Sequence, residues 1–118
     1  MSKDEIDLVW SCAVIVEGYD DNVIRKDSCG AWILRAEYGN TGSEFGWGVD
    51  HVLPISRGGD DNIVNLRPLQ WQNIQSKGTD FPIYYSSVIA EGDKNVPRVN
   101  QFRVSEALVG QLRKIYTF

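Results

Sequence analysis

The chain has 118 residues, of which 42% are hydrophobic and 24% are charged, and its formal net charge is −4. This length corresponds to one domain, residues 1–118, with enough apolar side chains for a single core. The negative charge argues against sequence-independent binding to nucleic acid, which needs an excess of Lys and Arg, although a local basic groove is still compatible with it. No apolar run approaches the ~20 residues of a membrane span, and the N-terminus lacks a secretory signal, so we expect a cytoplasmic protein without a membrane partner.

The cysteine and histidine content excludes a structural zinc site. The chain contains one histidine and two cysteines, Cys12 and Cys29. A closed zinc site needs four Cys or His ligands, which this set does not provide. Because nothing indicates an oxidising compartment, we expect two free, at least partly buried thiols.

The first half of the chain predicts one helix and two strands, separated by turns. The helix is expected over residues 3–12, where apolar residues recur at helical spacing. The strands are expected over residues 30–35 and 46–51. Clusters of Gly, Asn and Asp at residues 18–22 and 38–42 indicate the turns between them.

The second half predicts a short strand, a helix, a hairpin and a final helix. We expect the strand over residues 63–66 and a helix that has Pro68 in its first turn and ends at Gly78. Residues 82–90 and 97–104 predict the two strands of the hairpin. Ser105 is placed to cap the last helix, whose apolar stripe consists of Leu108, Leu112, Ile115 and Tyr116. The expected fold class is α+β.

The segment Asp50–Lys77 contains the residues that indicate a chemistry. The single histidine, His51, directly follows Asp50, and Asn65 comes fourteen residues later. Phosphodiester hydrolysis needs a cation to neutralise developing charge and a base to take a proton from water. Asp50 is a hard oxygen donor of the kind that Mg²⁺ prefers, and an imidazole with a reference pKa of ~6.5 suits a general base near neutral pH.

These residues belong to a longer set of residues that occur in a distinctive order. The set consists of Asp50-His51, Pro54, Ser56, Gly58-Gly59, Asp61, Asn65-Leu66, Pro68-Leu69, Trp71 and Lys77. In this order they resemble the HNH endonucleases of small bacterial and phage type, whose ββα-metal finger binds one divalent ion and cleaves nucleic acid. With matching residues upstream, the resemblance covers roughly residues 9–80.

The resemblance implies a fold and a set of roles. It implies a ββα-metal finger with its core at residues 46–80, followed by the C-terminal hairpin and helix. Asp50 would be the metal ligand, His51 the general base, and Asn65 a mainly structural residue of the catalytic site. The implied activity is hydrolysis of DNA with a weakly bound divalent ion, Mg²⁺ or Mn²⁺. Three cations are expected to contact phosphates: Arg57, Arg67 and Lys77.

One position departs from the family pattern. The third signature residue, a second metal ligand, commonly lies nine positions after the middle Asn, where this chain has Ile74, and Asn73 lies one residue earlier. One residue on a helix corresponds to about 100° of rotation and 1.5 Å of rise. Two readings therefore stay open. Either Asn73 or bound nucleic acid completes the metal site of an active nuclease, or the chain is a catalytically degenerate HNH-fold binding or regulatory protein, of phage or mobile-element origin, with a protein partner.

Overall fold

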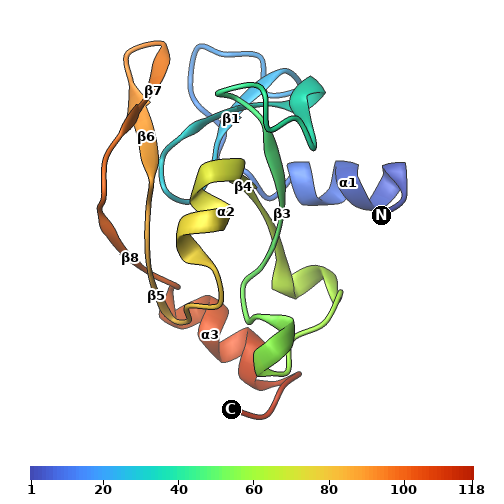
Figure 1. The fold of residues 1–118 in the computed structure, drawn as a ribbon. Helices are drawn as coiled ribbons and strands as arrows, with labels where there is room; N and C mark the ends of the chain where they lie inside the picture. The colour runs from blue at the N-terminus through green and yellow to red at the C-terminus, as the bar shows by residue number, and fades with distance from the viewer.

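Three helices and four two-stranded antiparallel sheets build one α+β domain (Figure 1) in a computed structural model that describes residues 1–118. In chain order the elements are α1 (Lys3–Trp10), β1 (Ile24–Lys26), β2 (Trp32–Leu34), β3 (Trp47–His51), β4 (Leu66–Gln70), α2 (Trp71–Lys77), β5 (Ile83–Tyr85), β6 (Val88–Glu91), β7 (Lys94–Pro97), β8 (Gln101–Arg103) and α3 (Glu106–Arg113). None of the helices has the length and apolar character needed to cross a membrane.

The N-terminal elements follow the predicted order, with one addition. Helix α1 starts with a capping box, in which the Ser2 hydroxyl accepts from the N–H of Glu5 and the Glu5 carboxylate accepts from the N–H of Ser2. Strand β1, which was not predicted, pairs antiparallel with β2. Its three residues are too few for an alternating apolar pattern to stand out in the sequence.

Strands β3 and β4 pair antiparallel, and α2 follows β4 without a loop. The predicted strand at residues 63–66 is wrong, because Ile63–Asn65 forms a 3₁₀ turn and β4 begins at Leu66. Pro68 lies in β4 opposite Val49 and not in the helix. A proline is tolerated there because β4 has a partner on only one side. The helix begins at Trp71 because the Gln70 side chain caps it, and it ends at Gly78, whose φ is 53°.

The C-terminal ribbon is more divided than the predicted single hairpin. Strands β6 and β7 form a hairpin around Gly92, while β5 pairs separately with β8. Between the two pairs, the Ser86 hydroxyl donates to the carbonyl of Arg98 and accepts from the N–H of Asn100. Backbone bonds from the Ser86 N–H to the Asn100 carbonyl and from the Arg98 N–H to the Ser87 carbonyl continue the ribbon, but the pairing register shifts by one residue between the two pairs, as at a β-bulge. Ser105 caps α3 as predicted, and Leu108, Leu112 and Tyr116 of the predicted stripe pack in the core. Ile115 and Tyr116 both lie beyond the end of the helix, and Ile115 is 43% exposed.

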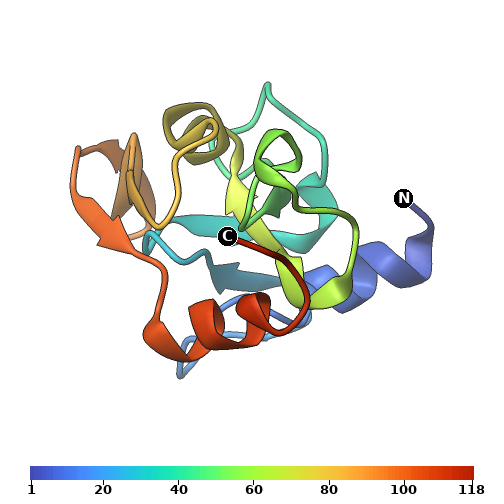
Figure 2. The same cartoon turned by 90° about the horizontal axis from the view of Figure 1, so that it is seen from below.

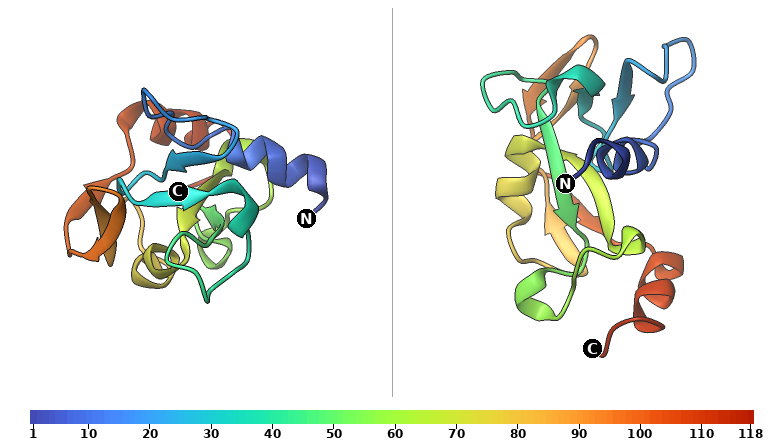
Figure 3. Two further views of the ribbon diagram at one scale, coloured as in Figure 1. Left: turned by 90° about the horizontal axis from the view of Figure 1, so that it is seen from above. Right: turned by 90° about the vertical axis from the view of Figure 1, so that its right-hand side faces the viewer.

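The β3–β4 sheet separates two hydrophobic clusters. Val9 and Trp10 of α1 pack with Trp47 and Leu66 on one face. The other face carries the larger cluster, which joins α3 to the sheet: Cys29, Val52, Leu69, Tyr84, Val104, Val109 and Leu112. Figure 3 shows α1 and α2 on opposite sides of β3 and β4. Figure 1 shows α3, the C-terminus and the loop that follows β3 at the lower end of the molecule, the end that Figure 2 views from below. Trp32 and Trp47 are buried, and Trp71 is half-buried.

A buried carboxylate, Asp27, ties the β2 region to the β3–β4–α2 segment. One oxygen accepts from the N–H groups of Cys29 and Ala31, both at 2.9 Å. The other accepts from the N–H of Gln70 at 2.8 Å and from Nδ2 of Asn73 at 3.1 Å. Burial raises the pKa of Asp27, and these four donors partly offset that effect. The carboxylate thus fixes the start of α2 against the turn before β2.

Candidate functional site

A surface hollow of about 310 Å³ lies where β3 meets the end of α2, and we call it the Asp50 hollow. Its lining comes from three segments: Val49, Asp50 and His51 of β3, Pro54 to Ser56 of the following loop, and Ile74, Gly78 and Thr79 at the helix. Neighbouring strand residues point to opposite faces of a sheet. The Asp50 side chain accordingly turns toward α2, while His51 turns toward the loop, and both still border the same hollow.

Asp50 is a buried carboxylate held by two cations. Arg67, which lies opposite it on β4, donates from Nε to Oδ2 at 3.1 Å. Lys77 of α2 places Nζ 3.3 Å from Oδ1 and also donates to the carbonyls of His51 and Val52. Asp50 is 6% exposed, so these pairs lie in a region of low dielectric where their attraction is strong. The negative charge expected to attract a metal is therefore already compensated.

His51 pairs with a carboxylate of the loop. Its Nε2 lies 2.7 Å from Oδ1 of Asp61, while Nδ1 has no hydrogen-bond partner in the protein. A neutral imidazole that donates from Nε2 to a carboxylate carries its lone pair on Nδ1. With a quarter of its side chain exposed, His51 can therefore present a proton acceptor to solvent. Asp61, ten residues after His51, was part of the sequence resemblance, but nothing in its spacing identified it as the histidine's partner.

Asn65 holds the loop and does not face the Asp50 hollow. Its Oδ1 accepts from the N–H of Leu53 at 2.7 Å, and its Nδ2 donates to the carbonyls of Leu53 and Asp60. Gly59 passes so close to this site that a Cβ would lie 1.9 Å from the Leu53 carbonyl oxygen, and Gly58 has a φ of 101°. The glycine pair is required by this turn. Asn65 thus holds the loop together by its hydrogen bonds, and its part in a catalytic site stays a prediction.

Asn73 lies on a different side of α2 from the Asp50 hollow. Its Oδ1 accepts from the N–H groups of Ser87 and Val88, and its Nδ2 donates to Asp27 and to the Val88 carbonyl. The side chain is fully buried, and its oxygen is occupied by two backbone donors. Ile74, one residue later, borders the hollow instead. The rotation of about 100° per helical residue separates the two directions, so the metal-ligand role expected for Asn73 has no support in this arrangement.

The three cations expected to contact phosphates lie in different environments. Arg57 is exposed and forms no ion pair. The Lys77 side chain is 0% exposed, so its ammonium group has no surface to offer a phosphate, and burial lowers its pKa although Asp50 counteracts the effect. Arg67 is directed to Asp50, and its guanidinium carbon lies 4.8 Å from the centre of the Tyr84 ring. Only Arg57 is free to meet a phosphate at the surface.

The side chains around the hollow do not fit a resident divalent ion. Asp50 is the one carboxylate in the lining, both of its oxygens are paired with cations, and Ile74 occupies the helix position beside it. No group of three or more His, Cys, Asp or Glu side chains is arranged to hold a metal. Mg²⁺ keeps several waters and needs few protein ligands, but those ligands are normally unpaired carboxylates.

No known protein-family model matches the chain, and no curated protein or solved structure is detectably similar to it.

Proposed function

We propose that this protein is an HNH-type nuclease domain that hydrolyses phosphodiester bonds of DNA, with His51 as the general base. The observation that carries the proposal is the His51–Asp61 pair at 2.7 Å, in which His51 borders the Asp50 hollow. The antiparallel pair β3–β4 followed directly by α2 supports it, because a ββα-metal finger has this order of elements.

The chemistry expected of the chain's own residues begins at the imidazole. With Nε2 facing Asp61, Nδ1 of His51 takes a proton from a water whose oxygen bonds to phosphorus. One bridging P–O ester bond breaks at the same time, and the leaving alkoxide takes a proton from solvent. The Asp61 carboxylate stabilises the imidazolium that forms and fixes the tautomer. Asn65 and Gly59 keep the loop in position, so that Asp61 stays beside the ring.

A divalent cation would supply charge neutralisation at the phosphate. Because the side chains do not fit a resident ion, we propose that Mg²⁺ or Mn²⁺ binds weakly and together with the phosphate oxygens of DNA. Metal dependence should then be measured with DNA present.

The test is nicking of supercoiled plasmid with Mg²⁺ or Mn²⁺. We expect His51→Ala to lower the rate roughly 10²–10⁴-fold, the usual contribution of a general base. Asp61→Asn should give an intermediate loss, whereas Asp93→Asn, on the β6–β7 turn, should have no effect. Equal nicking by wild type and His51→Ala, or none by either, would contradict the proposal.

A second candidate is a catalytically degenerate HNH-fold protein that binds or regulates a protein partner. The double ion pair on Asp50 and the apolar Ile74 favour it, since both oppose metal binding. Its test is calorimetric titration with Mn²⁺. Stoichiometric, tight binding that Asp50→Asn abolishes would exclude this candidate.

A further inference from the structure

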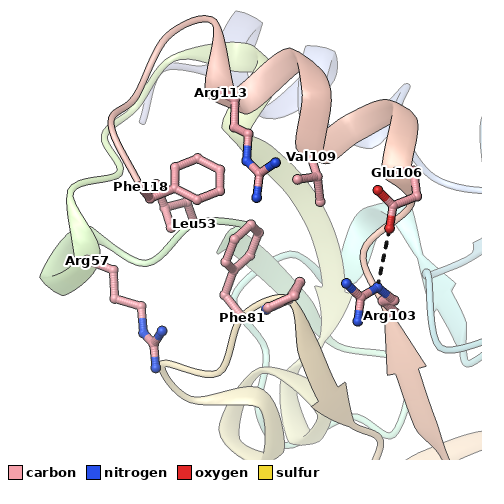
Figure 4. A pocket seen from close by; sticks show the side chains of 9 residues that line it. Leu53, Arg57, Phe81, Arg103, Glu106, Val109, Arg113 and Phe118 are labelled. Carbon is pink, nitrogen blue, oxygen red and sulfur yellow. Dashed lines mark ion pairs between the residues drawn. The ribbon is translucent and has the colours of Figure 1, made fainter.

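A second hollow, of about 280 Å³, lies between the loop after β3, the segment before β5 and helix α3 (Figure 4). Its apolar walls come from Leu53, Phe81, Val109 and Phe118, and we call it the α3 hollow. Pockets for small molecules usually measure roughly 300–1,000 Å³, so this one suits a single ring with a short substituent and not a large cofactor.

Three arginines line the α3 hollow: Arg57, Arg103 and Arg113. The only acidic residue of its lining is Glu106, which pairs with Arg103 at 3.6 Å. Arg57 and Arg113 form no ion pair. The hollow is therefore locally positive on a protein whose net charge is −4. Guanidinium groups bind phosphate in bidentate fashion, so the expected occupant carries a phosphate or a similar anion.

The aromatic side chains of the α3 hollow add a preference for a flat ring. Phe81 and Phe118 meet edge to face, with their centroids 5.3 Å apart. The Arg113 side chain extends from α3 alongside the Phe118 ring, and its guanidinium carbon lies 5.5 Å from the centre of Phe118 (Figure 4). Aromatic side chains combined with a guanidinium group form the surface on which nucleobases stack in single-strand-binding proteins.

The α3 hollow directly adjoins the Asp50 hollow. Leu53 and Arg57 border the α3 hollow, whereas the intervening residues, Pro54, Ile55 and Ser56, border the other one. A single turn of chain, Ile55–Arg57, thus separates the two. A strand lying across this turn would reach both hollows with neighbouring nucleotides.

We propose that the α3 hollow binds one unpaired nucleobase and its phosphate, next to the bond that faces the Asp50 hollow. The identity of this occupant rests on the proposed nuclease function. The base contacts the Phe81 and Phe118 rings, and Arg57 and Arg113 bind the phosphate. Because a paired and stacked base cannot enter a hollow, the protein prefers single-stranded DNA, or a site where a base is displaced, over intact duplex.

The experiment measures fluorescence anisotropy of a labelled single-stranded oligothymidylate and of a matching dT·dA duplex. It uses the full chain carrying His51→Ala, with EDTA present, so that neither cleavage nor metal contributes. We expect tighter binding of the single strand. Arg113→Gln and Phe118→Leu should each weaken that binding roughly tenfold, in line with a lost stacking or phosphate contact. Arg57→Gln, an exposed change that leaves the core intact, should act in the same direction.

Lys114→Gln is the matched control, because it removes one positive charge at the next residue outside the hollow. Loss of affinity by less than twofold in this variant supports the proposal. Equal losses in Lys114→Gln and Arg113→Gln, tighter binding of duplex, or no binding of the single strand would overturn it. Phenyl phosphate is the second probe: if it binds at the hollow while the oligothymidylate does not, the nucleic-acid occupant is wrong.

The two proposals fail separately. Single-strand binding that depends on Arg113 in a protein that never nicks DNA would contradict the nuclease and leave the α3 hollow as proposed. Nicking that requires His51, combined with single-strand binding that Arg113→Gln leaves unchanged, would contradict the α3 hollow alone.

Discussion

The ammonium nitrogen of Lys77 lies 3.3 Å from Oδ1 of Asp50, with the lysine side chain fully buried and the aspartate nearly so. This pair joins the end of α2 to β3 in the interior of the protein. Arg67 and Lys77 were expected to contact phosphates of DNA. In the structure they instead compensate the negative charge of the buried Asp50 carboxylate. Removing one partner of a buried ion pair destabilises the fold strongly, because it leaves the other charge buried without compensation.

We predict that Lys77→Met lowers the free energy of unfolding by roughly 3–5 kcal/mol, because it leaves Asp50 buried with Arg67 as its remaining partner. Urea denaturation followed by circular dichroism measures the change. Lys114→Met, which alters an exposed lysine, is the control and should change stability by less than about 0.5 kcal/mol. Similar stability of the two variants would mean that the Asp50–Lys77 pair does not form.

Ile74→Asn should convert the apolar side of the Asp50 hollow into an oxygen donor. Ile74 borders the hollow next to Asp50, so a carboxamide there can reach a cation that Asp50 alone binds weakly. We expect tighter Mn²⁺ binding in calorimetry and faster plasmid nicking than in wild type. Gln75→Asn, on the exposed side of the same helix, should change neither property. If Ile74→Asn leaves both measurements unaltered, position 74 is not a ligand position.

Asn73→Ala should destabilise the fold and leave metal affinity unchanged. The substitution removes four hydrogen bonds, to Asp27, Ser87 and Val88, and leaves their partners buried. A loss of roughly 3 kcal/mol or more is expected, since each unsatisfied buried group costs about 1–3 kcal/mol. Thermal or urea denaturation measures it, with Gln75→Ala as the exposed control on α2. Weaker Mn²⁺ binding with unaltered stability would instead support a ligand role for Asn73.

The two thiols should differ in reactivity at neutral and mildly alkaline pH. Burial, together with the nearby Asp27 charge, raises the pKa of Cys29 to about 12, whereas Cys12 is exposed. The thiolate is the reactive form, so at pH 8 only about one Cys29 in ten thousand is reactive. A chromogenic disulfide reagent should therefore modify one thiol in the native protein and two after denaturation. Cys12→Ser should abolish the native reaction; a fast reaction that persists in this variant would contradict the burial of Cys29.

Most of the fold followed from local patterns in the sequence. The capped helix α1, strand β3, the end of α2 at Gly78 and the Ser105 cap each depend on neighbouring residues alone. The errors came from longer-range effects. Pro68 is tolerated in β4 because only one side of that strand is paired, and the predicted hairpin is irregular where its register shifts by one residue and the Ser86 hydroxyl bonds across the strands. Neither the unpaired side nor the cross-strand bond can be seen in a local window of sequence.

The sequence indicated which residues lie near one another in the candidate site, but it did not indicate which side chains pair there. Asp50 and His51 are neighbours in the sequence, and the resemblance to the HNH pattern implied that residue 74 lies beside them, where the structure has Ile74. The pairing of Asp50 with Lys77, and that of His51 with Asp61, depends on how α2 and the loop fold back onto β3. The α3 hollow brings together residues from three distant parts of the chain, and no short sequence motif indicates it.

The Asp27 carboxylate, with its four donors from Cys29, Ala31, Gln70 and Asn73, has a consequence for dissecting this protein. A peptide cut to residues 46–80 would lack the acceptor for the Gln70 N–H and the Asn73 amide at the start of α2, and also the backbone of Ser87 and Val88 that Asn73 binds. Such an excised fragment is expected to remain unstructured in isolation, so grafting this strand–strand–helix unit onto another scaffold would require transplanting its surroundings as well.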